Sequence, residues 1–187
     1  MTTALVRLPD SLLVLERGWL SSNNIVFFEG DNAARVDSGY VSHAPQTLAL
    51  LERALDGRRL ARLINTHSHS DHIGGNAALK AAYDCEIIVP AGLHAAIADW
   101  DEDALLLSPL GQQSARFQHD SLIGAGSEIE MGGLNWQALA VPDSLVLLCS
   151  PSLRQSAELF RKVWQAYVTL GRPVPAVASI TSVPGRS

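Results

Sequence analysis

The sequence predicts a single mixed α/β domain, because antiparallel strand patterns at its beginning give way to strands that alternate with helices. Short apolar segments near the N-terminus are separated by turn-forming residues, which is typical of antiparallel strands. The next part of the chain alternates between strand and helix patterns, which indicates some parallel strands joined by crossover helices. With 187 residues and 47% apolar composition, the chain is long and apolar enough to bury one sizeable core.

The charge balance and the cysteines narrow the functional class and the compartment. Lys plus Arg total 14 and Asp plus Glu total 19, so the formal net charge is −5 and we expect no nucleic-acid partner. No segment approaches the roughly 20 apolar residues that span a bilayer, and residues 1–10 lack the apolar region of a signal peptide. We therefore expect a cytoplasmic protein without a membrane segment, in which Cys85 and Cys149 are buried, reduced thiols.

The first elements form an antiparallel start that leads into a helix. Three strands are predicted, at 11–16, 24–29 and 33–37. The turn between the last two is formed by Gly30-Asp31-Asn32. Ser42 is placed to cap a helix whose first turn tolerates Pro45, and Gly57 ends that helix. Between these limits leucines repeat at helical spacing, at Leu48, Leu51 and Leu55.

The remaining elements complete one domain over residues 1–150 and a C-terminal extension. Further strands are predicted at 60–65, 86–89, 128–131, 136–141 and 144–148, and helices at 75–83 and 91–100. We expect residues 101–126 to be irregular, with a solvated turn at Asp101-Glu102-Asp103. Apolar residues on one helical face predict an amphipathic helix over 151–170, and the proline-rich residues 171–187 predict a loosely ordered tail.

Four side chains that bind metal ions well follow directly after the strand at 60–65. They are His67, His69, Asp71 and His72. Alternate residues of an extended segment point the same way, so His67 and His69 can offer two imidazoles to one metal ion. A turn after the strand can aim Asp71 and His72 at the same pocket or at a neighbouring ion. So many ligand-type side chains at the end of a buried strand are costly for folding unless something binds them.

The ligand types in this cluster indicate a hydrolytic metal centre. Imidazole nitrogen and carboxylate oxygen suit zinc, iron or manganese. Such a metal brings the pKa of a bound water near neutrality and so supplies hydroxide for attack on a carbonyl or phosphorus centre. Asp71 is the candidate catalytic residue, because a nearby carboxylate can orient that water or move its proton. Gly74 and Gly75 are expected to let the backbone turn sharply before the next helix.

The cluster His67-Ser68-His69-Ser70-Asp71-His72 resembles the HxHxDH signature of the metallo-β-lactamase-fold hydrolases, which include glyoxalase II-type thioesterases. The resemblance extends over about residues 10–150. Three further parts of the chain share it: the flanks Asn65-Thr66 and Ile73-Gly74-Gly75-Asn76, the strand end Val36-Asp37-Ser38-Gly39, and the segment 124–133. The last of these is similar to the family's strand before the third metal ligand.

The resemblance implies a four-layer αββα sandwich with metal ions at one edge and a C-terminal half that is shortened or diverged. His67 and His69 would bind the first metal, Asp71 and His72 the second, and Asp37 would lie beneath the site. The implied cofactor is zinc, as one or two ions, with iron or manganese as alternatives. The implied reaction is attack by metal-bound hydroxide on an ester, thioester, amide or phosphoester of a small-molecule substrate.

The chain departs from the family after Pro142. Members usually continue there with Gly-His, whose histidine completes the first metal site, whereas this chain continues with Asp143-Ser144, and its last histidine is His119. The later bridging aspartate and final histidine of the family have no matching residue either. Two explanations remain: Asp143 replaces the missing imidazole, or residues were lost after Pro142 and the sequence beyond Leu148 no longer follows the family.

A second function therefore competes with hydrolysis. A site that has lost ligands would leave a catalytically silent binding or oligomerising module. In that case the amphipathic helix at 151–170 would serve as the contact surface of a homo-oligomer. A metal-loaded, folded sample that hydrolyses no ester or phosphoester would favour this second function.

Overall fold

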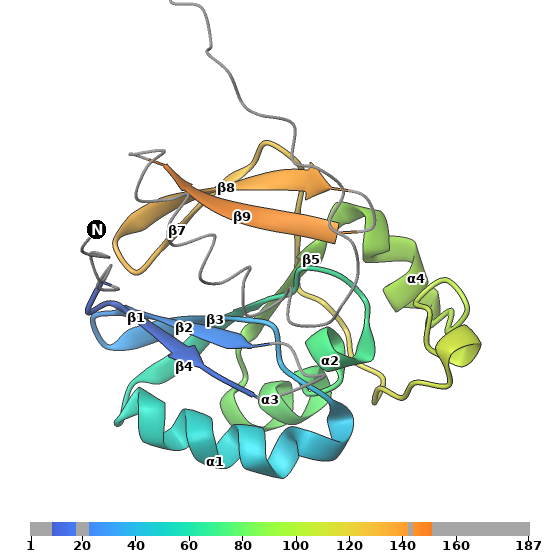
Figure 1. The fold of residues 1–187 in the computed structure, drawn as a ribbon, viewed down its shortest axis with the longest axis horizontal. Coiled ribbons are helices and arrows are strands. Elements are labelled where there is room, and N and C mark those ends of the chain that lie inside the picture. Colours follow the sequence, from blue (N-terminus) through green and yellow to red (C-terminus); the bar gives the residue numbers. More distant parts are fainter. Residues whose placement is uncertain (1–8, 18–22, 142–143, 151–187) are drawn as a thin grey trace, which may run out of the picture.

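The structure is a computed structural model that describes residues 9–17, 23–141 and 144–150, in which two β-sheets lie face to face (Figure 1). The strands of the larger sheet are β1 (Leu12–Leu15), β2 (Asn24–Glu29), β3 (Asn32–Val36), β4 (Arg59–Ile64), β5 (Glu86–Pro90) and β6 (Ser121–Ile123). Those of the smaller sheet are β7 (Glu128–Met131), β8 (Leu134–Val141) and β9 (Ser144–Ser150). The α-helices of the described ranges are α1 (Ala44–Leu55), α2 (Ser70–Ile73), α3 (Asn76–Tyr83) and α4 (His94–Asp99).

The pairing within the larger sheet confirms the predicted change from antiparallel to parallel strands. β1 pairs with β2, and β2 with β3, in antiparallel register. β3, β4, β5 and β6 then follow as parallel neighbours, with α1 crossing between β3 and β4 and α3 between β4 and β5. The smaller sheet is an antiparallel meander. Because parallel strands all end at the same edge, the loops after β3, β4 and β5 meet there.

Alternation along the strands of the larger sheet creates two separate apolar layers. One face of this sheet packs against α1 and α3, and the opposite face packs against β7 and β8 (Figure 1). Phe27 and Trp136 join the two sheets, with ring centroids 5.1 Å apart. Neighbouring residues therefore belong to opposite layers, as in the pairs Val26 and Phe27, Leu63 and Ile64, and Ile87 and Ile88. The described residues thus form a helical layer and two sheet layers of the sandwich.

Two expectations about secondary structure were wrong. Ser42 does not cap α1: it lies in a 3-10 turn, Val41–His43, and the helix begins at Ala44 after His43, which makes no side-chain capping hydrogen bond. Residues 101–126 are not irregular throughout, because β6 adds a parallel strand beside β5. This strand has only three residues and its central Leu122 is 47% exposed, so it leaves no periodic apolar pattern in the sequence.

The side chain of Asp120 explains why β6 pairs where it does. Its carboxylate Oδ2 accepts from the backbone N–H of Ile87 at 2.8 Å, and the Asp120 N–H donates to Ile87 O at 2.8 Å. Lys80 Nζ also donates to Asp120 Oδ2, at 3.1 Å. These contacts hold the start of β6 against β5, which a short strand could not do through its own ladder alone.

The remaining expectations are tested in part. The turn at residues 101–103 is exposed, as predicted. Cys85 is buried without a disulfide partner, and burial raises the pKa of its thiol to about 11. No helix within the described ranges is both long and apolar enough to cross a membrane. The Cys149 side chain and the predicted segments at 151–170 and 171–187 lie outside what the structure describes.

Gly74 and Gly75 are required for close packing and not, as predicted, for a sharp turn. Gly74 has ordinary helical angles, with φ of −60° and ψ of −29°, and Gly75 has φ of −86°. A Cβ atom on Gly74 would lie under 3 Å from backbone atoms of Val41, Ser70 and Tyr40. A Cβ atom on Gly75 would lie 2.7 Å from Ser38 O. The two glycines let the junction between α2 and α3 pack directly on the loop after β3.

We expect Gly74→Ala to lower the free energy of unfolding by about 3 kcal/mol, because the added methyl group overlaps backbone atoms that cannot rotate away. Urea denaturation followed by circular dichroism measures this change. Gly92→Ala is the matched control, since a Cβ there meets no atom within 4 Å. It should change the free energy by about 0.5 kcal/mol or less. Equal stability of the two variants would contradict the close-packing role of Gly74.

Candidate metal centre

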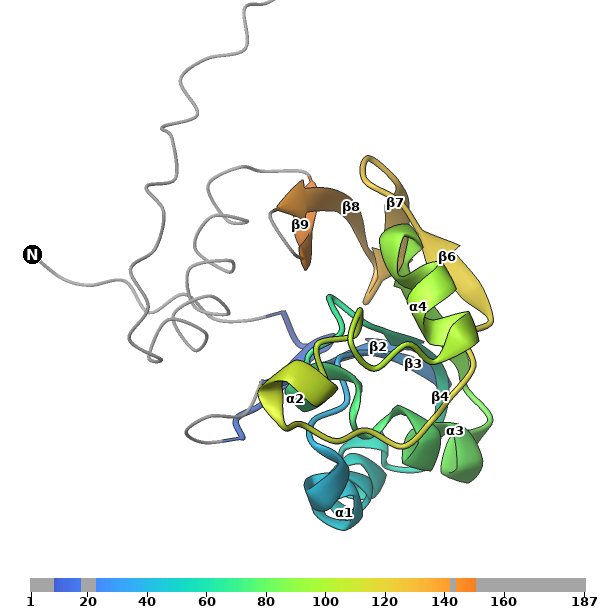
Figure 2. The ribbon, with the colours of Figure 1, turned by 90° about the vertical axis from the view of Figure 1, so that its right-hand side faces the viewer.

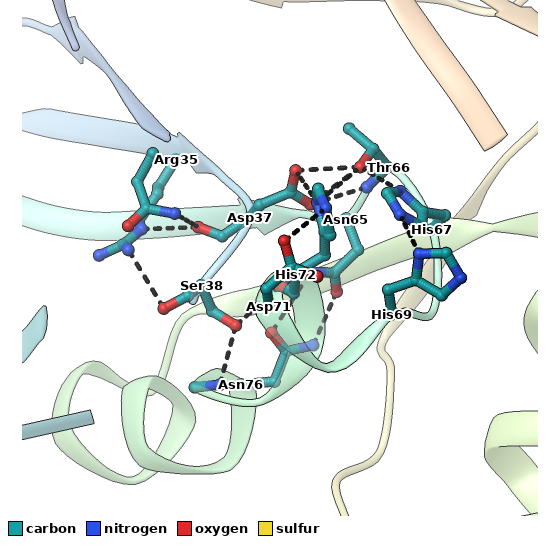
Figure 3. Close-up of polar contacts among 12 residues, drawn as sticks. Arg35, Asp37, Ser38, Asn65, Thr66, His67, His69, Asp71, His72 and Asn76 are labelled. Carbon is teal, nitrogen blue, oxygen red and sulfur yellow. Dashed lines mark hydrogen bonds and ion pairs between the residues drawn. The ribbon is translucent and has the colours of Figure 1, made fainter. Parts of the chain in front are cut away.

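The predicted ligand cluster lies at the carboxyl edge of the larger sheet, beyond the ends of β3 and β4 (Figure 3). Asp37 follows β3 directly. Its N–H donates to the carbonyl oxygen of Ile64, the last residue of β4, at 2.9 Å. The segment from Asn65 to His69 continues from β4, and the single-turn helix α2 then carries Asp71 and His72. The parallel pairing of β3 and β4 is what brings Asp37 beside the histidines.

The Asp37 carboxylate connects the end of β3 to the histidine segment through three donors. Oδ1 accepts from the Thr66 N–H at 2.9 Å, and Oδ2 accepts from the Thr66 hydroxyl at 2.9 Å. Oδ2 also accepts from Nδ1 of His72 at 2.7 Å. Because Nδ1 of His72 faces Asp37, its Nε2 is directed to the other side of the ring, 3.2 Å from Asp71 Oδ2. Asp37 therefore orients one predicted ligand toward the next.

The backbone of Asp37 is held as firmly as its side chain. Its φ is +57°, in the left-handed region that Asp tolerates better than most non-glycine residues. Its carbonyl oxygen accepts from Arg35 Nε at 2.8 Å and from Asn24 Nδ2 at 3.3 Å. Arg35 is fully buried, and burial together with the charge of Arg17 lowers its pKa to about 9. A second Arg35 bond, from Nη2 to Ser38 O at 3.3 Å, fixes the next residue of the turn.

A second set of buried polar contacts holds the backbone of His72. Its carbonyl oxygen accepts from Ser38 N–H at 2.8 Å, from the Ser38 hydroxyl at 2.9 Å and from Asn65 Nδ2 at 3.1 Å. Asn65 and Asn76 exchange amide hydrogen bonds, of which the shorter, from Asn76 Nδ2 to Asn65 Oδ1, is 2.7 Å. The two asparagines that belong to the sequence resemblance therefore brace α2 and do not line the cluster.

The four predicted ligands present their donor atoms in two close pairs. His67 Nε2 lies 3.0 Å from His69 Nδ1, and His72 Nε2 lies 3.2 Å from Asp71 Oδ2. The rings of His67 and His72 are adjacent, with centroids 3.8 Å apart. Donors of a tetrahedral zinc site at 2.0–2.1 Å from the ion are about 3.3 Å apart, so both pairs have a spacing that one ion can bridge. The imidazole nitrogens and the carboxylate oxygen are donor types that suit a divalent metal ion, although each pair supplies only two of the ligands that such an ion takes.

Thr66 selects the nitrogen that His67 offers. Its hydroxyl donates to Asp37, so its lone pair accepts from Nδ1 of His67 at 3.0 Å. Nε2 of His67 is then the unprotonated nitrogen, and it is the one that faces His69. The sequence reasoning did not assign Thr66 a role. The position of Thr66 directly before the ligand cluster could have indicated such a role.

The protonation states of the cluster follow from burial and from the two carboxylates. Burial, reinforced by the charge of His72, lowers the pKa of His67 to about 3, so this imidazole is neutral. Burial acts in the same direction on His72, but the charge and hydrogen bond of Asp37 outweigh it and raise its pKa to about 9. Burial opposes ionisation of Asp71, but its bond to His72 outweighs this and lowers its pKa. In the metal-free protein His72 is thus an imidazolium between two carboxylates, and its Nε2 would have to lose a proton to bind a metal ion.

A third ligand beside His67 and His69 is not found among the residues that the structure describes. Within the described ranges no group of three or more His, Cys, Asp or Glu side chains has an arrangement that holds a metal ion. Asp143, the predicted substitute ligand, lies outside those ranges, so both explanations for the departure after Pro142 stay predictions. His119 contacts His94, with Nε2 2.9 Å from Nδ1 of His94.

Two further residues near the cluster had no role in the sequence reasoning. Burial, and to a smaller extent the charge of Asp71, raise the pKa of Tyr40. Gln112 reaches the cluster from the segment after α4, where its Oε1 accepts from Ser70 N–H at 3.2 Å. Tyr40 follows the resembling strand end Val36–Gly39, whereas nothing around Gln112 marked it.

Fold and site together define a class of protein. A two-sheet sandwich with a histidine and aspartate cluster at the carboxyl edge of its parallel strands is the architecture expected for the metallo-β-lactamase fold. The family model described as the metallo-beta-lactamase superfamily matches residues 17–144. The chain belongs to this superfamily.

Solved structures support the fold assignment. The FEZ-1 metallo-beta-lactamase from Legionella gormanii superposes with a TM-score of 0.63 at 14% identity, covering 74% of this chain and 55% of that one. A beta-lactamase from Chitinophaga pinensis superposes with a TM-score of 0.63 at 19% identity, covering 76% of this chain and 55% of that one. Identities this low show a shared fold alone, and they confirm the predicted fold class.

Curated relatives are similar over a shorter part of the chain. A hydroxyacylglutathione hydrolase from Rhodopseudomonas palustris is 36% identical over 77 residues, which covers 34% of this chain and 29% of the relative. The corresponding enzyme from Methylococcus capsulatus is 54% identical over 41 residues, covering 21% of this chain and 16% of the relative. The chain therefore spans less than a third of the length of these relatives.

In metal-free protein, Asp37→Asn should lower the free energy of unfolding by about 3 kcal/mol near pH 6, because it leaves a buried imidazolium without its main carboxylate. The pKa of His72 rises from 6.5 to about 9 on folding. A raised pKa stabilises the fold fully below pH 6.5, and the stabilisation is lost as pH rises through about 9. The difference between wild type and variant should shrink over that range.

Urea denaturation in the presence of a chelator, at several pH values, measures this difference. Asp99→Asn is the control, since Asp99 is exposed at the end of α4. It should leave the free energy of unfolding unchanged at every pH. A constant difference between wild type and Asp37→Asn across the series would contradict the ion pair with His72.

Proposed function

We propose that this chain is a metal-dependent hydrolase of the metallo-β-lactamase superfamily, with zinc as its cofactor, as one or two ions, and iron or manganese as alternatives. One observation carries the proposal: two pairs of donor atoms, 3.0 Å and 3.2 Å apart, lie side by side at the edge of the sheet. His67 and His69 would hold a first ion, and Asp71 and His72 a second. Asp143, or a residue of a neighbouring chain, would complete the first set.

A bound divalent ion supplies Lewis-acid polarisation and brings the pKa of water near neutrality. The protein residues supply orientation and proton handling. Thr66 keeps Nε2 of His67 unprotonated, and Asp37 keeps Nε2 of His72 directed at Asp71. Asp71 Oδ2 would accept the proton of the attacking water, because the hydrogen bond and the charge of His72 lower the pKa of this carboxyl and keep it ionised.

The substrate class we propose is an ester, thioester, amide or phosphoester of a small molecule, hydrolysed in the cytoplasm. Thioesters are the first class to test. The curated relatives that match part of this chain are hydroxyacylglutathione hydrolases by name. The fold alone does not select among these substrates, because specificity depends on the loops over the metal edge.

The silent binding module remains the competing function. It is favoured by the missing third donor within the described ranges. The metal content of the purified chain distinguishes the two functions, and it can be measured before a substrate is known. A module that has lost its site would fold without metal, and its partners would then be sought, starting with a second copy of this chain.

We expect the purified chain to carry about one or two equivalents of a transition metal, measured by elemental mass spectrometry. The double variant His67→Ala/His69→Ala should lose at least half of this content. His94→Ala is the matched control, because it removes an exposed histidine from α4 and should keep the full content. Near-zero metal in a wild-type sample that unfolds cooperatively would exclude the metal-dependent hydrolase.

Zinc- or manganese-loaded protein should hydrolyse at least one member of a panel of thioester, ester, amide and phosphoester substrates. Asp71→Asn should reduce that rate by about 100-fold or more, the usual contribution of a general base. The Asp99→Asn variant should retain the wild-type rate. Loaded, folded protein that turns over no member of the panel would leave the binding module as the function.

A further inference from the structure

A glutamine from outside the ligand segment contacts the turn that carries the ligands. Gln112 Oε1 accepts from the backbone N–H of Ser70 at 3.2 Å, although the two residues are 42 positions apart in the chain. Ser70 is 1% exposed, and it is the first residue of α2. The contact therefore lies between His69 on one side and Asp71 and His72 on the other.

The N–H of Ser70 needs a partner from elsewhere in the fold. The first N–H groups of any helix have no carbonyl partner within the helix, and an unsatisfied buried N–H is costly. His69 stands at the capping position of α2, and it makes no side-chain capping bond. Gln112 supplies the acceptor instead. This bond holds the first residue of α2, while Ser38 and Asn65 hold the carbonyl of His72 in the same turn.

Gln112 is itself held by a folded segment. Its N–H donates to Leu107 O at 2.8 Å, and the preceding Gly111 adopts a left-handed φ of +61° after the 3-10 turn Ser108–Leu110. Leu105 and Leu107 are buried in the helical-side core and anchor this segment. In the view of Figure 2 the segment crosses in front of α2. The backbone of Gln112 is therefore held in place by a packed segment, and its side chain is half-buried.

We propose that Gln112 is a positioning residue of the metal centre, which clamps the first turn of α2 so that the donor pairs of His67 with His69 and of Asp71 with His72 keep their spacing. This inference rests on the proposed metal-dependent function. It extends the site to the segment after α4, which the ligand motif does not include. Residues that hold metal ligands commonly change metal affinity when replaced, even without touching the ion.

The identity of the side chain predicts how variants differ. Gln112→Ala removes the acceptor and should weaken zinc binding by about 10-fold. Gln112→Glu keeps an acceptor oxygen at the same reach, so it should restore zinc affinity to within about 3-fold of the wild type. Gln113→Ala is the matched control, since its side chain is exposed and lies next in the chain. It should leave zinc affinity unchanged.

The experiment has two readouts on the full chain. Zinc affinity is measured by competition with a chromophoric chelator, and amide hydrogen exchange of Ser70 is measured by NMR in metal-free protein. Gln112→Ala should speed exchange at Ser70 by about 10-fold while amides of the β4 core keep their wild-type rates. The exchange readout reports the clamp itself, whether or not metal is bound, and a global loss of stability would speed exchange everywhere.

The outcomes separate this inference from the proposed function. If Gln112→Ala binds zinc as tightly as Gln113→Ala, Gln112 has no positioning role, while the metal-dependent function stands. If the wild type itself binds no zinc, the proposed function fails, and the positioning role fails with it. If zinc affinity falls and the Ser70 amide exchanges faster only in Gln112→Ala, with rescue by Gln112→Glu, the inference is supported.

Discussion

The buried contact between Asp37 and His72 is the interaction on which the arrangement of this site depends. A carboxylate and an imidazolium, both nearly inaccessible to water, meet at 2.7 Å where the ends of β3 and α2 converge. A pair of this kind is stable only if its other polar atoms are also satisfied. Thr66 does this for the carboxylate, and Asp71 for the far side of the imidazole. One carboxylate at the end of β3 therefore orients His72 directly and His67 through Thr66.

Close packing makes this polar arrangement possible. The absence of a side chain at Gly74 and Gly75 lets α2 approach the loop after β3 closely enough for the His72 carbonyl to reach Ser38. Beneath the loop, Nε and Nη2 of the buried Arg35 donate to the backbone carbonyls of Asp37 and Ser38 in the same turn. The apolar layers on both faces of the larger sheet keep water away from these contacts, which strengthens them. Close backbone packing and the buried polar contacts therefore both hold this edge of the sheet.

Much of the site could be predicted because its signals are local. His67, His69, Asp71 and His72 occupy six consecutive positions after a strand pattern, and the structure brings all four together. The resemblance also singled out Asp37, whose carboxylate contacts His72 in the structure. Gln112 could not be predicted, because a single hydrogen bond between residues far apart in the chain leaves no pattern in either segment. The strand β6 was missed for a related reason: its pairing depends on β5 and Asp120, not on its own apolar residues.

The sequence by itself determined the order of strands and helices apart from β6, the two-faced alternation of the core and the residue types in the cluster after β4. These properties depend on neighbours a few positions apart, so periodicity and composition record them. Only the tertiary structure decided that Asp37 reaches His72, which nitrogen each histidine offers, and that Gly74 serves close packing and not a turn. Those properties depend on distances between segments that the parallel pairing of β3 with β4 brings together, and no local pattern contains such distances.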